Sequence, residues 1–193
     1  MQSALRWRVA VKRIVSSGRS SVCLASSSRH TLAMPYSVDV TNDQSAVSIS
    51  EDRIREIVEG TLRAERVVEA EISVALIDDS AIHRVNRDHL DHDFPTDVIS
   101  FLFEEEIVGG ESDSPLRGAG KRIEGEVLVS GDTAVREAAK FGWSAEDELA
   151  LYLVHGLLHL CGYDDLTEEE QPIMRNQERA VLALWGLKPH YDE

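Results

Sequence analysis

The sequence predicts an α+β domain in which a small mixed β-sheet packs with about five helices. Three observations favour this class. Strand and helix patterns follow one another in the order βαβαββααα, no repeat of about 20 to 50 residues is present, and one long helix is apolar nearly all round. With 193 residues, 42% of them hydrophobic, the chain is long enough for one domain with a core and too short for a second full domain.

The first half of the chain contains the patterns of two strands and two helices. A short strand is expected at residues 46–50, followed by a helix that Ser50 caps and that runs to about Arg66. Residues 69–78 alternate polar and apolar side chains before becoming wholly apolar, as a strand does on entering a core. A second helix is expected from about Ser80 to His89.

The second half predicts two strands and then three helices. Residues 96–106 and 124–132 have the β-branched and aromatic content of strands, and the residues between them are rich in Gly, Ser and Pro, which predicts a loop. The expected helix boundaries are Asp132 and Gly142 for the first helix, a Ser144–Asp147 capping box for the second, and a Thr167–Glu170 capping box with a stop at Gly186 for the last.

Charge is distributed unevenly and suggests a division of the chain. Residues 1–38 hold six basic residues and no acidic one, whereas residues 39–193 hold 14 basic and 35 acidic residues, a net charge of -21. We expect residues 39–193 to form a single domain and residues 1–38 to be a disordered extension or a start-site artefact, with Met34 as the true beginning. An organellar transit peptide is the less favoured interpretation of the same composition.

Composition also narrows the partners and the compartment. An acidic body has no general attraction for nucleic acid, so DNA is not expected as a partner and any RNA must be bound at a local site. The chain has only two cysteines and no apolar run of the roughly 20 residues that a membrane span needs. We therefore expect a soluble, cytoplasmic protein without a membrane partner.

The stretch VHGLLHLCGYDD, residues 154–165, is the strongest chemical motif. His155 and His159 are four residues apart on the apolar helix, so they project from one side, about 6 Å apart along its axis at roughly 1.5 Å per residue. Gly162 can then turn the chain back and bring the Asp165 carboxylate to the same point. This spacing favours a metal site over a pair of hydrogen-bonded core histidines, because buried imidazoles need partners.

Several alternatives stay open around this motif. Asp165 is either the third ligand or the cap of the next helix, and Cys161 or Asp164 could take its place as ligand. A zincin protease has a glutamate base directly after its first histidine, and this chain has Gly156 there. Glu148, two helical turns before His155, could act as a base or orient a ligand, although an acid in a first turn is ordinarily a dipole partner.

Four separate motifs carry a resemblance to a known family. HGLLHLCGYDD, FPTDVISF, GEVLVSGD and MRNQE, over roughly residues 47 to 185, closely resemble the YbeY family of zinc-containing rRNA maturation endoribonucleases with a metalloprotease-like fold. The resemblance implies one zinc ion per chain, cleavage of single-stranded RNA at the 3′ end of small-subunit rRNA, and a part in ribosome quality control. The implied partners are ribosomal RNA and the small ribosomal subunit or a ribosomal protein.

The resemblance assigns roles residue by residue and exposes two departures. His155 and His159 match the first two of the family's three histidine ligands and are the expected catalytic residues, whereas Asp165 stands at the third position. An arginine of the family, thought to hold RNA, is Leu90 here. Candidates for substrate binding are Arg87, His92 and Thr96, and His89 is expected at the surface. Asp97 either supports the cleft with Thr96 or starts a strand, and the family asparagine at Asn86 has no derived role.

Three functional hypotheses follow. The leading hypothesis is a zinc-dependent endoribonuclease, with attack by water at the metal or by the RNA's own 2′-hydroxyl left open. The second is another metal-dependent hydrolase acting on a peptide or small ester. The third is a metal-stapled ribosome-binding module with weak catalysis, which the departures at Asp165 and Leu90 motivate.

Overall fold

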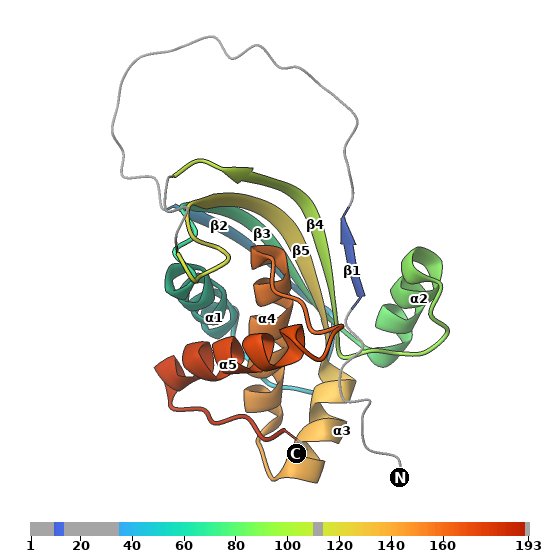
Figure 1. The fold of residues 1–193 in the computed structure, drawn as a ribbon. Coiled ribbons are helices and arrows are strands. Elements are labelled where there is room, and N and C mark those ends of the chain that lie inside the picture. Colours follow the sequence, from blue (N-terminus) through green and yellow to red (C-terminus); the bar gives the residue numbers. More distant parts are fainter. Residues whose placement is uncertain (1–9, 14–34, 110–113, 192–193) are drawn as a thin grey trace.

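The structure, a computed structural model, describes residues 10–13, 35–109 and 114–191. One mixed sheet of five strands runs in the order β1-β4-β5-β3-β2 and forms the centre of the fold (Figure 1). Neighbouring strands are parallel except for β4 and β5, which pair antiparallel. The strands are β1 (Ala10–Arg13), β2 (Tyr36–Asn42), β3 (Glu69–Ile77), β4 (Val98–Ile107) and β5 (Lys121–Ser130). The predicted α+β class with a mixed sheet is confirmed.

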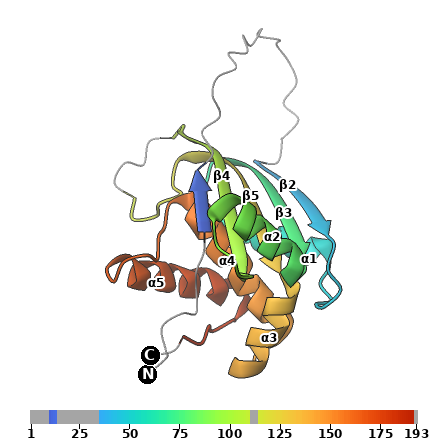
Figure 2. The same ribbon diagram turned by 90° about the vertical axis from the view of Figure 1, so that its right-hand side faces the viewer.

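Five α-helices surround the sheet, as the sequence predicted. They are α1 (Glu51–Ala64), α2 (Asp79–Leu90), α3 (Gly131–Phe141), α4 (Ala145–Cys161) and α5 (Glu170–Leu182), and a short 3-10 turn (Ala183–Trp185) follows α5. Helices α1, α4 and α5 lie on one side of the sheet, here called the inner face, and α2 lies on the opposite side, the outer face (Figures 1 and 2). None of the helices in the described ranges has the length and apolar character needed to cross a membrane.

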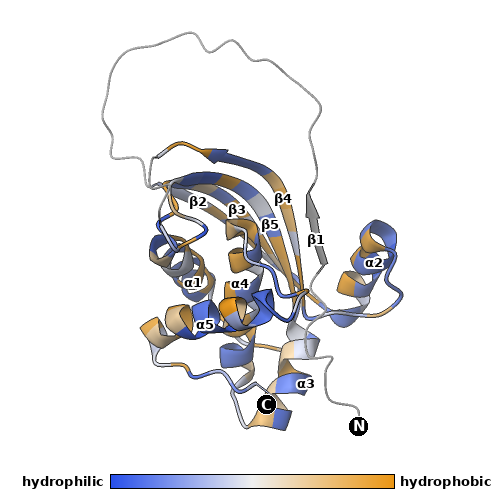
Figure 3. Ribbon diagram, in the orientation of Figure 1, coloured by the Kyte–Doolittle hydropathy of each residue, from blue (hydrophilic) through white to orange (hydrophobic). Residues whose placement is uncertain are grey.

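The inner face carries the main core because the strand residues alternate. In β3, the even-numbered residues Ala70, Ile72, Val74 and Leu76 are buried in this core, and α4 packs beside them over β4 and β5. Fourteen of the seventeen residues of α4 are buried, so this helix runs through the interior, and its apolar character is visible in Figure 3. A smaller cluster of Ile82, Ile99, Phe101 and Leu128 fixes α2 to part of the outer face.

One predicted strand is misplaced. Residues 46–50 form no strand, because the side chain of Gln44 binds both the N–H of Val47 (2.8 Å) and its carbonyl (2.9 Å) and so closes a turn. The strand at this edge of the sheet is β2, which pairs in parallel with β3. Part of β2 and all of β1 therefore lie within residues 1–38, while Met34 and the start-site and transit-peptide hypotheses lie outside the described residues.

Most predicted helix boundaries agree with the structure, with two changes of cap. Ser50 and Ser144 cap α1 and α4, and Gly142 ends α3 in the left-handed conformation. Ser130, not Asp132, caps α3, because the Asp132 carboxylate instead accepts the N–H of Asp79 at the start of α2 (3.0 Å). The Thr167 hydroxyl accepts the N–H of Glu170 (3.1 Å), but this bond closes the turn before the helix: α5 begins at Glu170 with Glu169 as its N-cap and has no side-chain cap, so the predicted Thr167–Glu170 capping box is wrong.

Candidate metal centre

Helix α4 brings the two predicted histidines together inside the protein. The Nε2 atoms of His155 and His159 are 3.1 Å apart, and the ring planes are nearly perpendicular at 85°. His155 is 1% exposed and His159 is 5% exposed, so bulk water does not satisfy their ring nitrogens. Their partners must come from the protein or from a bound ion.

The hydrogen bonds of the two Nδ1 atoms fix the tautomer of each histidine. Nδ1 of His159 lies 2.9 Å from the carbonyl oxygen of Tyr163, and a carbonyl only accepts, so this Nδ1 carries a hydrogen. Nδ1 of His155 lies 2.5 Å from Oε1 of Glu178 and donates to that carboxylate. In their neutral forms, both histidines therefore direct an Nε2 lone pair into the same small space. Two nitrogen lone pairs 3.1 Å apart repel each other unless a proton or a metal cation lies between the two Nε2 atoms.

Asp165 completes the group. Its carboxylate oxygens lie 3.6 Å from Nε2 of His159 and 3.9 Å from Nε2 of His155. Gly162, at a φ of 107°, ends α4 in a conformation that favours glycine and turns the chain back toward the two histidines. One ligand atom from each of His155, His159 and Asp165 lies within 4.8 Å of the others, so the three residues could hold a metal ion.

The two alternative third ligands, Asp164 and Cys161, contact other groups. The Asp164 carboxylate accepts the N–H groups of Asp165 (2.8 Å) and Leu166 (3.2 Å), so Asp164 has the turn-capping role that competed with the ligand role of Asp165. The thiol of Cys161 points to the loop before β5, where a Cβ placed on Gly118 would lie 3.1 Å from Sγ. Burial raises the pKa of this thiol. Cys161 is therefore a core residue of the α4 C-terminus.

The donor set fits a divalent cation. Two imidazole nitrogens and one carboxylate oxygen are a ligand combination that zinc accepts in proteins, with a remaining position left for water or substrate. Both histidines also have the acceptor on Nδ1 that metal-ligating histidines usually have, which fixes the ring orientation.

Glu178 on α5 is a site residue to which sequence reasoning assigned no role. It is 2% exposed, and its carboxylate accepts hydrogen bonds from Nδ1 of His155 and from the hydroxyl of Tyr191. It shares the core-facing side of α5 with Met174, Val181 and Leu182. A glutamate at a position where the helical period demands an apolar residue was the available signal, but the sequence does not identify its partner 23 residues away.

Burial and neighbouring charges shift the pKa values of the three candidate ligands in different directions. Burial lowers the pKa of His155, but the hydrogen bond and charge of Glu178, with the charges of Asp165 and Asp97, outweigh it and raise this pKa. For His159, burial and the neighbouring His155 both lower the pKa. Burial raises the pKa of Asp165, and the charge of His155 opposes that shift. The pKa values therefore favour His155 over His159 as the site of protonation.

Packing explains the glycine between the histidines. A Cβ built on Gly156 would lie 2.8 Å from Cγ1 of Val127, 2.9 Å from Oγ of Ser100 and 3.0 Å from Cγ2 of Val98. The Ser100 hydroxyl also donates to the Gly156 carbonyl at 2.9 Å. Position 156 thus faces the sheet, and no glutamate side chain fits there to act as the base of a zincin protease.

Glu148 is separated from the three ligands along α4. Two helical turns, or about 10 Å of rise, lie between Glu148 and His155. Glu148 is 1% exposed, and the raised pKa of the buried Tyr152 hydroxyl results from burial first and then from the charges of Asp97 and Glu148. Asp97 is itself buried, which raises its pKa, and it accepts the Thr96 hydroxyl at 2.8 Å. The catalytic role of Glu148 stays a prediction.

The predicted substrate-binding residues lie on α2 and the loop after it. Arg87 is exposed and pairs with Asp88 (3.1 Å), while the His92 ring stacks on Phe94 with centroids 5.4 Å apart. Thr96 is buried beside Asp97. Binding by Arg87, His92 and Thr96 therefore stays a prediction.

Three further residues of this segment make packing contacts or hydrogen bonds within the fold. Leu90 packs against the smaller cluster under α2, and the exposed His89 lies edge-on to Phe101, with ring centroids 5.9 Å apart. Asn86 is buried and donates from Nδ2 to the carbonyl of Phe94 (2.8 Å). Asn86 therefore holds the loop between α2 and β4.

Known sequences similar to this chain share one description. A family model described as Endoribonuclease YbeY matches residues 39–186. A protein of that name from Bacillus cereus (strain G9842) is 40% identical over 136 residues, which is 69% of this chain and 85% of the relative. Another, from Geobacillus thermodenitrificans, is 38% identical over 152 residues, covering 78% of this chain and 94% of the relative.

A solved structure supports the fold independently. The solution structure of TM1509 from Thermotoga maritima matches with a TM-score of 0.50 and 23% identity, covering 77% of this chain and 91% of TM1509. Together, the family match over most of the chain, the two bacterial relatives and the shared fold show that this chain belongs to the YbeY family.

Proposed function

We propose that the chain is a zinc-dependent, single-strand-specific endoribonuclease that matures the 3′ end of small-subunit rRNA and takes part in ribosome quality control. The observation that carries the proposal is the convergence of the His155 and His159 Nε2 atoms with the Asp165 carboxylate at one buried point. Family membership and the relatives' shared name, Endoribonuclease YbeY, support RNA as the substrate.

The chain's own residues would hold and orient the site. His155, His159 and Asp165 bind the zinc ion, one per chain, while Glu178 and the Tyr163 carbonyl hold the two imidazoles in the required tautomer. When bound, the ion supplies positive charge for the scissile phosphate and increases the acidity of water. Compared with a third histidine, Asp165 lowers the net charge of the site by one, which weakens phosphate attraction.

RNA must reach an acidic protein. Residues 39–193 have a net charge of -21, so phosphate affinity would come from local contacts, for which Arg87, His92 and Thr96 are our candidates, or from a partner. We propose the small ribosomal subunit, or one of its proteins, as the partner that places the acidic body on rRNA in the cytoplasm. Glu148 is proposed as an auxiliary base, and neither DNA nor a membrane is expected as a partner.

Metal content and RNA cleavage, measured on the same preparations, test the proposal. The wild type should hold about one zinc per chain and cut a single-stranded oligoribonucleotide but not its duplex. His159→Ala and Asp165→Ala should lose both properties, whereas the matched control Asp164→Ala should keep both. Loss of metal without loss of cleavage would overturn the proposal.

The chemistry of the cut can be read from the same reactions. A 2′,3′-cyclic phosphate among the products indicates attack by the RNA's own 2′-hydroxyl, whereas a 5′-phosphate or a directly formed 3′-phosphate indicates attack by water. A folded, metal-loaded wild type that binds ribosomes but cuts no RNA would instead favour a ribosome-binding module.

A further inference from the structure

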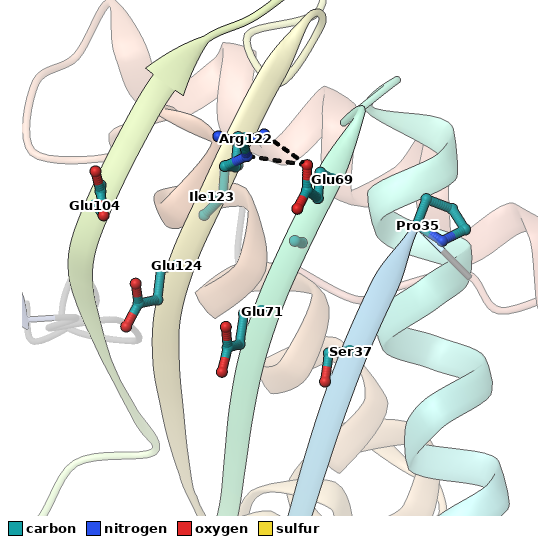
Figure 4. Close-up of a pocket in the computed structure, with 9 residues that line it drawn as sticks. Pro35, Ser37, Glu69, Glu71, Glu104, Arg122, Ile123 and Glu124 are labelled. Atoms are coloured by element: carbon teal, nitrogen blue, oxygen red, sulfur yellow. Dashed lines mark hydrogen bonds and ion pairs between the residues drawn. The ribbon is translucent and has the colours of Figure 1, made fainter. Parts of the chain in front are cut away.

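Three glutamates lie side by side on the outer face of the sheet. In the strand register, Glu71 of β3 is opposite Glu124 of β5, and Glu124 is opposite Glu104 of β4. All three are exposed and form a row across neighbouring strands (Figure 4). The row is separate from the candidate metal centre, which α4 builds on the inner face.

This arrangement costs folding free energy. Like charges that lie directly opposite in a sheet destabilise the strand pair. The register cannot slip to separate them, because a shift of one residue would expose the buried neighbours Ile72 and Ile123. The core thus determines the positions of the row but does not require glutamate there, and a Ser or Thr would suit an exposed strand equally well.

The described cations form no ion pair with the row. Among the described residues that line the groove, Arg122 is the one cation, and it hydrogen-bonds to Glu69 (2.9 Å) and Glu106 (3.2 Å). Among the described residues, no hydrogen bond or ion pair reaches Glu71, Glu104 or Glu124. In the described part of the chain the row is therefore a negative strip without an ion-paired cation, and Arg122 interacts only through its charge with Glu104. The flanking Glu126 also faces the outer side, with its pKa raised by partial burial.

The same strip lines a groove that has space for a ligand. A cavity of about 170 Å³ lies between the glutamate row, Arg122 and the start of β2 at Pro35 and Ser37. Helix α2 packs on the other half of the outer face through the cluster of Ile82, Ile99, Phe101 and Leu128, and within the described ranges it does not line this groove. We propose that this half of the outer face docks an extended polypeptide segment rich in Lys and Arg, contributed by another protein.

Charge and spacing favour this occupant. The phosphates of RNA would be repelled by the row, so the face is not part of a substrate path. In an extended segment, alternate side chains point to the same side about 7 Å apart, while neighbouring strands of the row are about 4.8 Å apart. Basic side chains at alternate positions can therefore reach two or three carboxylates at once. Their positive charges would offset the repulsion between the glutamates, which favours binding.

A matched pair of triple variants tests the proposal in the full chain. Glu71→Gln, Glu104→Gln and Glu124→Gln together remove the row, and Asp52→Asn, Asp88→Asn and Glu168→Gln remove the same charge from scattered exposed positions. The probe is a fluorescently labelled peptide of alternating Lys and Ser, with binding followed by anisotropy. We expect roughly tenfold weaker binding for the row variant and less than about twofold for the control.

Three outcomes would overturn the proposal. Equal weakening in both variants would mean that only net charge matters, and no binding by the wild type would mean that the face has no affinity for basic segments. Competition by free spermine or Mg²⁺ at the affinity of the peptide would identify a small-cation site instead. RNA cleavage by the row variant should equal that of the wild type, which shows that the fold and the metal centre are intact.

Discussion

Nδ1 of His155 donates to Oε1 of Glu178 across the interface between α4 and α5, at 2.5 Å. Both residues are almost completely buried, and the second carboxylate oxygen of Glu178 accepts the Tyr191 hydroxyl. The carboxylate therefore cannot turn away from the imidazole without losing a second partner. It orients Nε2 of His155 toward His159 and Asp165.

Replacing Glu178 should weaken metal binding while leaving all three ligands in place. In Glu178→Gln the amide can present a donor instead of an acceptor, which favours the wrong tautomer of His155, and we expect zinc affinity to fall about 10- to 100-fold. Competition with a chromophoric chelator measures the affinity. The exposed Glu168→Gln is the control, and equal affinities would show that Glu178 does not orient the ligand.

Asp165→His should keep the metal and increase cleavage. A neutral third ligand raises the net positive charge of the site by one, which strengthens attraction for a phosphate and makes bound water more acidic. Zinc content by elemental analysis and initial cleavage rates of single-stranded RNA are the measurements. A variant that keeps its zinc but cleaves more slowly than the wild type would contradict this account of the aspartate.

Metal affinity should fall as the pH is lowered, because zinc binding requires neutral imidazoles and an ionised carboxylate. Glu178 raises the pKa of His155 and burial raises that of Asp165, so protons compete with the metal more strongly than ordinary values predict. The decline should therefore begin above pH of about 6.5, the ordinary histidine value. Chelator competition across a pH series checks this, and a pH-independent affinity would contradict it.

The same shift has the opposite sign for stability without metal. Because the pKa of His155 is raised on folding, its contribution is fully present below the unfolded-state pKa and is lost as the pH rises through the folded-state pKa. Urea unfolding of the chelator-treated protein should show this contribution, and Glu178→Gln should remove it.

Gly156→Ala should destabilise the protein, because its methyl group would lie within 3.0 Å of Val127, Ser100 and Val98. Overpacking of this kind costs about 1 to 3 kcal/mol. Urea unfolding gives the free energy. Gly156→Glu should be worse and should show no peptidase activity, whereas a stable variant that cleaved peptides would contradict the packing argument.

Glu124→Gln should stabilise the fold. Glu124 has a glutamate opposite it on both neighbouring strands, and removing its charge relieves two unfavourable pairs at about 0.2 to 1 kcal/mol each. The free energy of unfolding should rise most at low salt, where the repulsion is least screened. Glu168→Gln serves as the comparison, and a destabilised Glu124→Gln would show that the row supports the fold.

Local patterns predicted the parts of the fold that depend on local physics. The spacing of His155 and His159, the glycine turn at Gly162 and the alternation in β3 were all visible in the sequence, because helix and strand periods are local properties. The caps at Ser50 and Ser144 were found for the same reason.

Long-range partners were not predictable in this way. The bond from Glu178 to His155 depends on how α5 crosses α4, and the turn made by Gln44 is invisible until β2 pairs with β3. The sequence predicts Asp132 as the cap of α3, but its carboxylate accepts the N–H of Asp79 at the start of α2, a contact between residues 53 apart, and Ser130 caps the helix.

The pairing of β1 with β4 has a consequence for shortened forms of the chain. Residues Ala10–Arg13 cover the backbone of Ile99–Leu102 along one margin of the sheet. A polypeptide that starts at Met34, or one trimmed to that point, would lack β1 and leave backbone N–H and C=O groups of β4 without hydrogen-bond partners. Uncovered strand margins recruit strands from other molecules, so such a form should self-associate more readily than the full chain.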